Sequence, residues 1–553
     1  MSEQENKLTR REFIKQGAVA GAAALTLGPL ALAKGLAGTP EAPKSAAIGT
    51  ALTGRLKADF SKILQPISRN IYGHFAEHMH QDVYMGLWIG ENSELAPSVP
   101  NLRGWRKDVL EMVQALQPPV IRWPGGCFSE HYHWEDGLGP REKRLNRFNR
   151  AWSEIEPNMV GTHEFMDFCQ LVGAQPMFAA NVRTGSTEEA AAWVEYCNGS
   201  VATTQGKRRA ANGHPAPFNV RYWCIGNETW DAGAEPSAQK HVAFSRAMKA
   251  VDPNIKVTAV SGYPLNLAEW NSAMLNIAGK ELDYLAPHHY DGLVVKPGKD
   301  EAELHYGNQL IARRFAGSVA ATIAQIEKAM PNRPEVAVSL DEWGIWVEDD
   351  PDFNQNYCLS DALLAAGTFN SFQRLGPRLQ IACWAQLVNV LGLIRARQNR
   401  AWPTAVYEVF RLYTNLCGDH LAQAQVDCPS VNARVGQGSS GGPSINDALP
   451  LLDVSATISP GNGQAAIVMV NRAYAEKLTV KLEIAGLEKG KGAISLHTLD
   501  GPSVTSRKSP QQPATTVKVS SETLADLPTE LVLPPHSLTV LSVGGSLTRR
   551  SSP

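Results

Sequence analysis

The sequence has no concentration of charge of one sign. Its 52 Lys and Arg residues nearly balance its 54 Asp and Glu residues, for a formal net charge of -2. Because nucleic acids and anionic membranes are recognised by a concentrated basic surface, this composition predicts neither partner. A hydrophobic content of 43% and a charged content of 19% are ordinary for a soluble globular enzyme, and 553 residues favour two domains or one large domain with an accessory one.

The chain also lacks a long uninterrupted apolar run. The twin-arginine pattern TRREFIK (9–15) precedes an Ala/Gly-rich segment that is too short and glycine-rich for a stable membrane anchor, and ALA (31–33) resembles a cleavage site. This pattern is typical of a bacterial Tat export signal, which carries folded proteins. We therefore expect a signal peptide over 1–34, a linker over 35–46, and a protein located in the periplasm or outside the cell.

Cysteines are few and scattered. None of the eight lies at metal-ligand spacing or in a disulfide framework. A Tat substrate folds in the reducing cytoplasm, so buried free thiols are expected. Cys417 and Cys428 are close enough in sequence to pair after export, and the sequence leaves that question open.

Residues 67–395 alternate short apolar runs with segments of helical period. Several helical segments open with Ser or Thr as an N-cap. Eight strands that each accompany a helix are the pattern of a (β/α)8 TIM barrel of the α/β class. A doubly wound sheet is the main alternative, but no G-x-G-x-x-G turn follows a predicted strand in this region. The predicted strands are 70–77, 119–124, 176–181, 220–228, 256–261, 282–290, 335–342 and 379–386.

The C-terminal part, 396–545, changes to the period of strands. The alternation VKLEI (480–484) is typical of an antiparallel β-sandwich with a solvated face. The Ser/Gly-rich stretch 435–450 is predicted to be a flexible loop within this domain. Residues 47–66 look strand-like and are expected to join the sandwich from the N-terminal side, and 546–553 form a tail.

Acidic side chains stand at the ends of two predicted barrel strands. Glu228 and Glu342 end the fourth and seventh strands, at the face where barrel enzymes carry out their chemistry. Retaining glycosidases need two such carboxyls about 5–5.5 Å apart, one a nucleophile and the other an acid. Other strand ends carry amides, carboxylates and aromatics, which fit a hydroxyl-rich ligand such as a sugar. Asn227 can bind the hydroxyl next to the reacting carbon.

Six longer motifs, in this order, resemble the α-L-arabinofuranosidases of glycoside hydrolase family 51. The resemblance covers residues 50–545 and implies an exo-acting, retaining enzyme that releases terminal arabinofuranose from arabinan, arabinoxylan or derived oligosaccharides. The expected reaction needs no cofactor, and the resemblance suggests a homo-oligomer, which in this family is often a hexamer. The motifs are IYGHFAEHM (71–79), IRWPGGCFSEHYHWEDGLGP (121–140), GTHEFMDFC (161–169), NGHPAPFNVRYWCIGNETW (212–230), LDEWGIW (340–346) and AQLVNVLG (385–392).

The resemblance also implies roles for individual residues. Glu228 would be the acid/base and Glu342 the nucleophile. The residues that would bind substrate are Glu77, Cys127, Asn227, Tyr290, Trp346 and Gln386. The sequence departs from the family pattern at ETWDAGAEP (228–236) and in an insertion at 435–450. The first departure leaves contacts beyond the released sugar open, but not the reaction.

Several of these residues also have structural interpretations. Glu77 could form a core ion pair with Arg122. Asp341 should point away from Glu342 by the period of a strand and be structural. Tyr290 and Gln386 could be satisfied core groups. Of the tryptophans, Trp123 and Trp343 are more typical of packing than of sugar binding.

The sequence also contains patterns of two other chemistries and leaves two other functions open. The histidine pairs, such as His78 with His80 and His288 with His289, lack a third zinc ligand at usable spacing and more commonly bind carboxylates or hydroxyls. A G-x-S-x-G pattern at 438–442 lies in a loop and not on the strand-to-helix elbow that a serine hydrolase requires. An endo-glucanase or β-xylosidase on the same scaffold is an alternative. A non-catalytic carbohydrate-binding protein is another, although it would not need both Glu residues.

Overall fold

The computed structural model describes residues 52–95, 99–264, 266–347, 353–438, 440–487, 492–511, 516–545 and 547. The predicted signal peptide, the linker, residues 47–51 and nearly all of the predicted tail lie outside the described residues.

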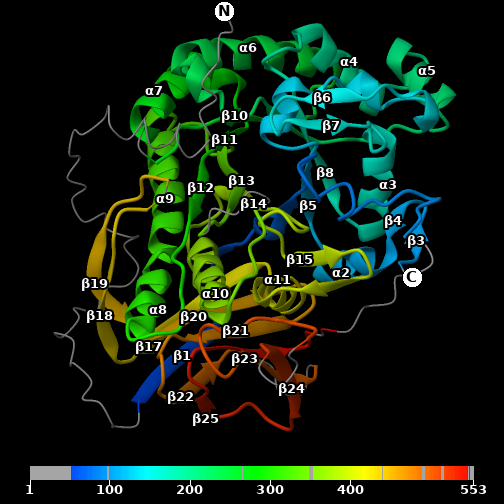
Figure 1. The fold of residues 1–553 in the computed structure, drawn as a ribbon. Helices are drawn as coiled ribbons and strands as arrows, with labels where there is room; N and C mark the ends of the chain where they lie inside the picture. The colour runs from blue at the N-terminus through cyan, green and yellow to red at the C-terminus, as the bar shows by residue number, and fades with distance from the viewer. Residues whose placement is uncertain are drawn as a thin grey trace, which may run out of the picture.

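Parallel strands close into a barrel in the upper part of Figure 1. Nine strands occupy eight positions, because the sixth position is split into β11 and β12, and β14–β2 and β11–β13 pairings complete the ring. The predicted TIM-like barrel is confirmed. Its strands are β2 (Gly73–Phe75), β5 (Val120–Trp123), β8 (Gln175–Ala180), β9 (Tyr222–Ile225), β10 (Lys256–Val260), β11 (Tyr284–Ala286), β12 (His288–Asp291), β13 (Ala337–Ile345) and β14 (Leu379–Ala385).

Pro287 separates the two halves of the sixth strand. β11 ends directly before it and β12 begins directly after it. Proline has no backbone N–H to donate to a strand ladder, so a break at this residue is expected. Consequently β12 pairs with β13, while β11 pairs with both β10 and β13.

The helices surround the barrel. Ser186 accepts a hydrogen bond from the N–H of Glu189 and caps the start of α4 as predicted. Thr404, beyond the region of the predicted helices, accepts one from the N–H of Tyr407 at the start of α11. α11 follows the eighth strand and packs on α10 and α2. α11 lies on the C-terminal side of the domain boundary predicted at 395–396 and also contacts β21 and β26 of the C-terminal sheet. The helices are α2 (Lys107–Leu116), α3 (Thr162–Val172), α4 (Thr187–Asn198), α5 (Thr204–Ala211), α6 (Ala234–Val251), α7 (Leu267–Ala278), α8 (Glu301–Leu310), α9 (Ala312–Ala329), α10 (Leu359–Arg374) and α11 (Ala405–Leu416).

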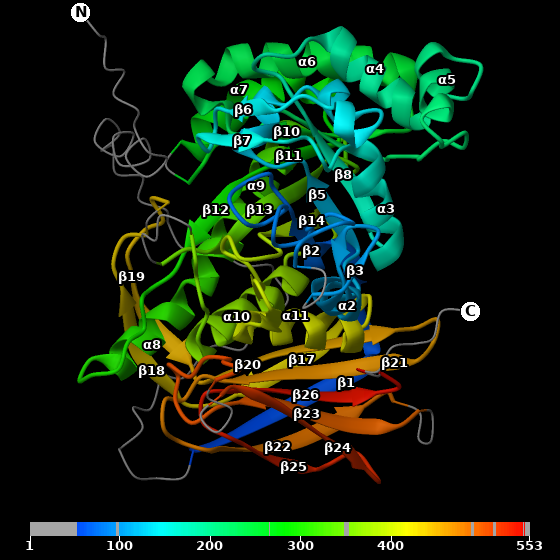
Figure 2. The same cartoon turned by 45° about the vertical axis from the view of Figure 1, so that its right-hand side comes forward.

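A nine-stranded sheet lies beneath the barrel (Figures 1 and 2). The N-terminal strand β1 enters it between β17 and β22, antiparallel to the first and parallel to the second. The sequence pattern had indicated an antiparallel sheet. The observed sheet is mixed, because β1 and β22 are parallel. Its strands, in spatial order, are β24 (Lys518–Leu524), β23 (Ile494–Asp500), β26 (Ser537–Val543), β21 (Gln464–Asn471), β20 (Leu452–Ser459), β17 (His420–Asp427), β1 (Leu52–Pro66), β22 (Leu478–Ala485) and β25 (Glu530–Leu533).

Strand β21 is buried on both faces and joins the two parts of the molecule. Ala466, Val468 and Val470 belong to the main core with the barrel helices. Ile467 and Met469 face the second core, which the sheet forms with itself. Successive residues of β21 thus point alternately into two apolar layers. On the side of the main core, the C-terminal sheet packs onto α10 and α11.

Part of the predicted loop 435–450 is a strand. Residues Ser430–Val435 (β18) and Ile445–Pro450 (β19) form an antiparallel hairpin. The hairpin lies beside α8 in both views (Figures 1 and 2), so it is not a free loop within the sandwich. The sequence analysis predicted a loop here from the high Gly and Ser content. The Gly and Ser residues lie in the turn of the hairpin and show no alternating apolar pattern that would indicate strands.

Three further short hairpins complete the described strands. The small hairpins are β3 (Asn101–Leu102) with β4 (Trp105–Arg106), β6 (Arg147–Asn149) with β7 (Glu154–Glu156), and β15 (Ile394–Arg397) with β16 (Arg400–Pro403). All eight cysteines are free thiols, and Cys417 and Cys428 do not pair. Within the described ranges, none of the helices has both the length and the apolar character that a bilayer crossing demands.

Candidate active site

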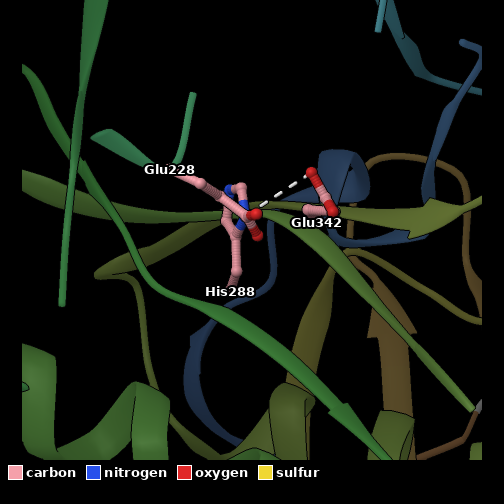
Figure 3. A group of neighbouring side chains, drawn as sticks. All are labelled: Glu228, His288 and Glu342. Carbon is pink, nitrogen blue, oxygen red and sulfur yellow. Dashed lines mark hydrogen bonds and ion pairs between the residues drawn. The ribbon is translucent and has the colours of Figure 1, made fainter. Parts of the chain in front are cut away.

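The two acidic residues singled out from the sequence converge at the mouth of the barrel. Glu228 follows β9, and Glu342 lies in β13. One carboxylate oxygen of each, together with a ring nitrogen of His288, all lie within 4.8 Å of one another (Figure 3). Glu342 is 2% exposed. Residues 114 positions apart along the chain therefore form one site.

His288 bridges the carboxylates and carries a positive charge at neutral pH. Its Nδ1 lies 2.9 Å from Glu228 Oε1 and 3.4 Å from Glu342 Oε2, and its Nε2 lies 3.1 Å from Asp341 Oδ1. Burial lowers the pKa of His288, but the charge and hydrogen bonds of these three carboxylates outweigh burial and raise it to about 9. The sequence analysis expected this histidine to bind a carboxylate or a hydroxyl, and His288 binds carboxylates.

The same three side chains, Glu228, His288 and Glu342, have the spacing of a metal site. In the structure, both ring nitrogens of His288 lie at hydrogen-bonding distance from carboxylate oxygens, Nδ1 from Glu228 and Nε2 from Asp341. Elsewhere, His78 contacts Glu156, His133 contacts Glu189, and His289 contacts Ser318, in agreement with the prediction that the histidines bind carboxylates or hydroxyls.

Arg122 is a second cation in the site. Its Nη1 lies 3.0 Å from Glu342 Oε2, its Nε lies 3.3 Å from Asp341 Oδ2, and its Nη2 donates to Asn227 Oδ1 at 2.8 Å. The suggested core pair with Glu77 is therefore wrong, because the guanidinium faces the other carboxylates. This buried guanidinium donates a charge-assisted hydrogen bond to Glu342 and orients that carboxylate.

Asp341 does not point away from Glu342. Both carboxylates contact Arg122 and His288. The register explains this: Leu340 pairs with Ala382 and Trp343 with Trp384, so Asp341 and Glu342 together oppose a single residue of β14. Such a β-bulge inserts one extra residue and redirects side chains, which breaks the period of two on which the prediction relied.

The strand that carries Glu228 ends in an unusual backbone turn. Gly226 has φ +80°, and a Cβ there would lie 2.6 Å from Val182 Cγ2, so glycine is required. Glu228 itself has φ +45° and precedes the short helix Thr229–Ala232. The N–H of Asn227 donates to Glu130 Oε1 at 2.9 Å. The turn thus presents Asn227 and Glu228 together to the site, held by a carboxylate that the sequence analysis had not singled out.

Glu77 accepts hydrogen bonds from several donors around it. Its Oε1 accepts from the N–H groups of Gly126 and Phe128 at 3.1 and 2.9 Å and from Trp152 Nε1 at 3.2 Å. Its Oε2 accepts from Gln386 Nε2 at 3.2 Å. Glu77 and Gln386 are each 3% exposed. Trp152 is another site residue that no local signal in the sequence revealed.

The remaining predicted residues connect these groups. Asn227 Nδ2 lies 3.9 Å from Cys127 Sγ, and the phenol of Tyr290 donates to Glu342 Oε1 at 2.7 Å. Trp346 meets the Tyr290 ring edge-on at 5.6 Å between centroids. All eight site residues predicted from the sequence thus belong to one connected arrangement. Trp123 and Trp343 are buried in aromatic clusters, as predicted for packing residues.

Comparison with known proteins decides the family. Residues 112–292 match the family model "Alpha-L-arabinofuranosidase 1 domain" and residues 341–537 match "Alpha-L-arabinofuranosidase C-terminal domain". A GH51 α-L-arabinofuranosidase structure from Thermotoga petrophila has 35% identity and a TM-score of 0.79, over 89% of this chain and 100% of that one. A probable α-L-arabinofuranosidase C of Aspergillus niger is 32% identical, over 86% of this chain and 95% of the relative. The chain belongs to the α-L-arabinofuranosidases of glycoside hydrolase family 51.

This arabinofuranosidase also resembles an intracellular exo-α-L-arabinofuranosidase of Bacteroides ovatus, with 34% identity over 63% of this chain and 70% of the relative. The activity predicted from the sequence motifs is confirmed, and so is the barrel with a C-terminal sheet-rich domain. The enzyme is a glycoside hydrolase. The alternatives of a different glycosidase and of a binding protein without catalysis are therefore set aside.

Proposed function

We propose that this arabinofuranosidase is exo-acting and retaining, and that it releases terminal arabinofuranose from arabinan, arabinoxylan or derived oligosaccharides by double displacement. The observation that carries the proposal is the approach of Glu228 and Glu342 oxygens to within 4.8 Å. Retaining glycosidases hold their carboxyls about 5–5.5 Å apart, whereas inverting enzymes leave about 6.5–9.5 Å for a water molecule. The site is too narrow for the inverting arrangement.

In the first step, Glu342 attacks the anomeric carbon while Glu228 protonates the leaving oxygen. Arg122 and Tyr290 each hold one oxygen of Glu342 and thereby orient the attacking carboxylate. As Glu228 gives up its proton it becomes negative beside the imidazolium of His288, 2.9 Å away. That interaction strengthens towards the transition state, which is what lowers a barrier.

In the second step, Glu228 accepts a proton from water, and the water attacks the arabinosyl-enzyme ester. Asn227, Glu77 and Gln386 supply buried amide and carboxylate groups that bind the furanose hydroxyls, with Cys127 beside them and Trp346 at the flank. Since Asn227, Glu77 and Gln386 are only 2–3% exposed, they fit a single terminal sugar better than the interior of a polymer. This supports exo action.

Chemical rescue of paired variants tests the assignment. Glu342→Gly should lower hydrolysis of an aryl α-L-arabinofuranoside by about 10⁴-fold or more, and azide should restore turnover with an inverted, β-configured arabinosyl azide. Glu228→Ala should react with azide to give the α-configured azide. Glu335→Ala, at an exposed position before the same strand, serves as the matched control. Full activity of Glu342→Gly, or β-arabinofuranose as the first product by NMR, would overturn the mechanism.

We also infer export by the Tat pathway to the periplasm or the cell exterior, and a homo-oligomer. The twin-arginine pattern at 9–15 supports export. The Bacteroides relative is described as intracellular, so the location requires its own test. Cell fractionation should find the wild-type enzyme outside the cytoplasm and the Arg10→Lys/Arg11→Lys variant inside it.

Light scattering of the purified enzyme tests the proposed homo-oligomer, and the mass of a monomer would refute it.

A further inference from the structure

Tyr290 lies in β12 and directs its side chain into the active site. One edge of β12 pairs with another strand. Within the part of the chain that the structure describes, β12 pairs with β13 alone. The N–H of Trp346 donates to the carbonyl oxygen of Asp291 at 3.3 Å, so the backbone of Asp291 faces β13. Because successive residues of a strand direct their backbone groups to opposite edges, the N–H and C=O of Tyr290 face the other edge.

A hydroxyl from the C-terminal domain meets both of these groups. Tyr290 N–H donates to Ser440 Oγ at 3.2 Å, and the Ser440 hydroxyl donates to the Tyr290 carbonyl oxygen. Serine can do both because its oxygen is one donor and two acceptors. Ser440 is 8% exposed and lies 150 residues further along the chain. One side chain thus takes the place of a neighbouring strand at the edge of β12.

The turn that delivers Ser440 is anchored to the barrel on both sides. Arg314 Nη1 lies 2.9 Å from Asp291 Oδ2, and both side chains are buried. The same guanidinium donates to the carbonyl oxygens of Gly436 and Pro443, before and after Ser440. A Cβ on Gly438 would lie 2.4 Å from Asp291 Oδ2, so glycine permits this close approach. Residues of the β18–β19 turn on both sides of Ser440 therefore contact barrel side chains next to Tyr290.

The side chain of Tyr290 connects this backbone contact with Ser440 to the proposed nucleophile, Glu342. Its hydroxyl donates to Glu342 Oε1 at 2.7 Å, within the narrow range in which an O–H···O bond is effective. We propose that Ser440 is a positioning residue for the glycosidase reaction, which holds the Tyr290 backbone so that its phenol orients Glu342. This inference rests on the proposed role of Glu342 as nucleophile. It makes the C-terminal domain a contributor to catalysis through a residue of the β18–β19 turn.

The first test compares Ser440→Ala with Ser444→Ala, an exposed serine of the same turn. In Ser440→Ala we expect kcat for an aryl arabinofuranoside to fall about tenfold with KM nearly unchanged, because a small displacement of a catalytic group slows chemistry more than binding. The acid limb of the kcat profile should move to higher pH, since ionised Glu342 loses a well-placed donor. Ser444→Ala should match the wild type. An unchanged kcat and pH profile in folded Ser440→Ala would overturn the proposal.

A double-mutant cycle then asks whether Ser440 acts through Tyr290. If it does, adding Ser440→Ala to Tyr290→Phe should change kcat by less than about twofold, because the phenol hydroxyl is already absent. An equal loss in both backgrounds would refute positioning through Tyr290 and leave a structural role only. The Glu342→Gly experiment distinguishes failure of the mechanism from failure of the Ser440 proposal. If Glu342→Gly keeps full activity, the proposed mechanism is wrong. If Glu342→Gly is inactive but Ser440→Ala behaves like the wild type, only the proposed role of Ser440 is wrong.

Discussion

His288 is predicted to stabilise the folded enzyme through its charge. Its pKa is raised from 6.5 to about 9 by Glu342, Asp341 and Glu228, against the opposing effect of burial. A folded-state pKa above the unfolded one gives stability that is fully present below pH 6.5 and lost as the pH rises through about 9. Since one pKa unit corresponds to about 1.36 kcal/mol, the imidazolium contributes about 3 kcal/mol at its maximum.

The perturbation is His288→Gln, which keeps a hydrogen-bonding group but cannot take up a proton. Urea unfolding of both proteins should be measured from pH 6 to pH 9 at constant ionic strength. The wild type should be the more stable at pH 6, and its advantage should shrink by about 3 kcal/mol by pH 9 as the wild-type imidazolium loses its proton.

A second buried histidine provides the control. Burial lowers the pKa of His241 to about 4, so this residue is neutral throughout the interval from pH 7 to pH 9. The stability difference between the wild type and His241→Gln should therefore be constant there, whatever its size. A pH-independent difference for His288→Gln as well, or an NMR titration that places the pKa of His288 at or below 6.5, would refute the reasoning.

Two further variants follow from the same site. Arg122→Lys should lower kcat for an aryl arabinofuranoside about 100-fold, because an ammonium cannot bind Asp341, Glu342 and Asn227 at once as the planar guanidinium does; kinetics near wild type would contradict this. Burial raises the pKa of Glu130 to about 7, so the stability associated with its proton is present below pH 4.5 and lost as the pH rises through about 7. Relative to the wild type, Glu130→Gln should thus gain up to about 3 kcal/mol between pH 5 and pH 8 in urea unfolding, and a flat difference would argue against a buried titrating carboxyl.

Much of the barrel was predictable because its signals are local. Each predicted strand overlaps an observed one, and the run YWCI (222–225) is followed by Gly226, Asn227 and Glu228 in the structure as in the prediction. The split of the sixth strand at Pro287 has an equally local cause. The boundary of the barrel was less predictable, because whether α11 belongs to the barrel or to the C-terminal domain depends on what it packs against.

Some residues of the site were predictable from the sequence and others were not. Glu228 and Glu342 stand out by their place at strand ends. Arg122 and Trp152 do not, since an arginine within a strand and a tryptophan in a loop have many possible partners. Asp341 misled the prediction because a β-bulge is invisible without the register of the neighbouring strand.

By itself, the sequence determined the succession of strands and helices and the chemical groups at the strand ends, because hydrophobic period, turns and motifs act over short stretches of chain. Only the tertiary structure decided the charge of His288, the sharing of Arg122 by two carboxylates and the reach of Ser440 to Tyr290. These depend on desolvation and on distances of a few ångströms between groups far apart in the chain, which exist only once the barrel has closed and the C-terminal sheet has packed against it.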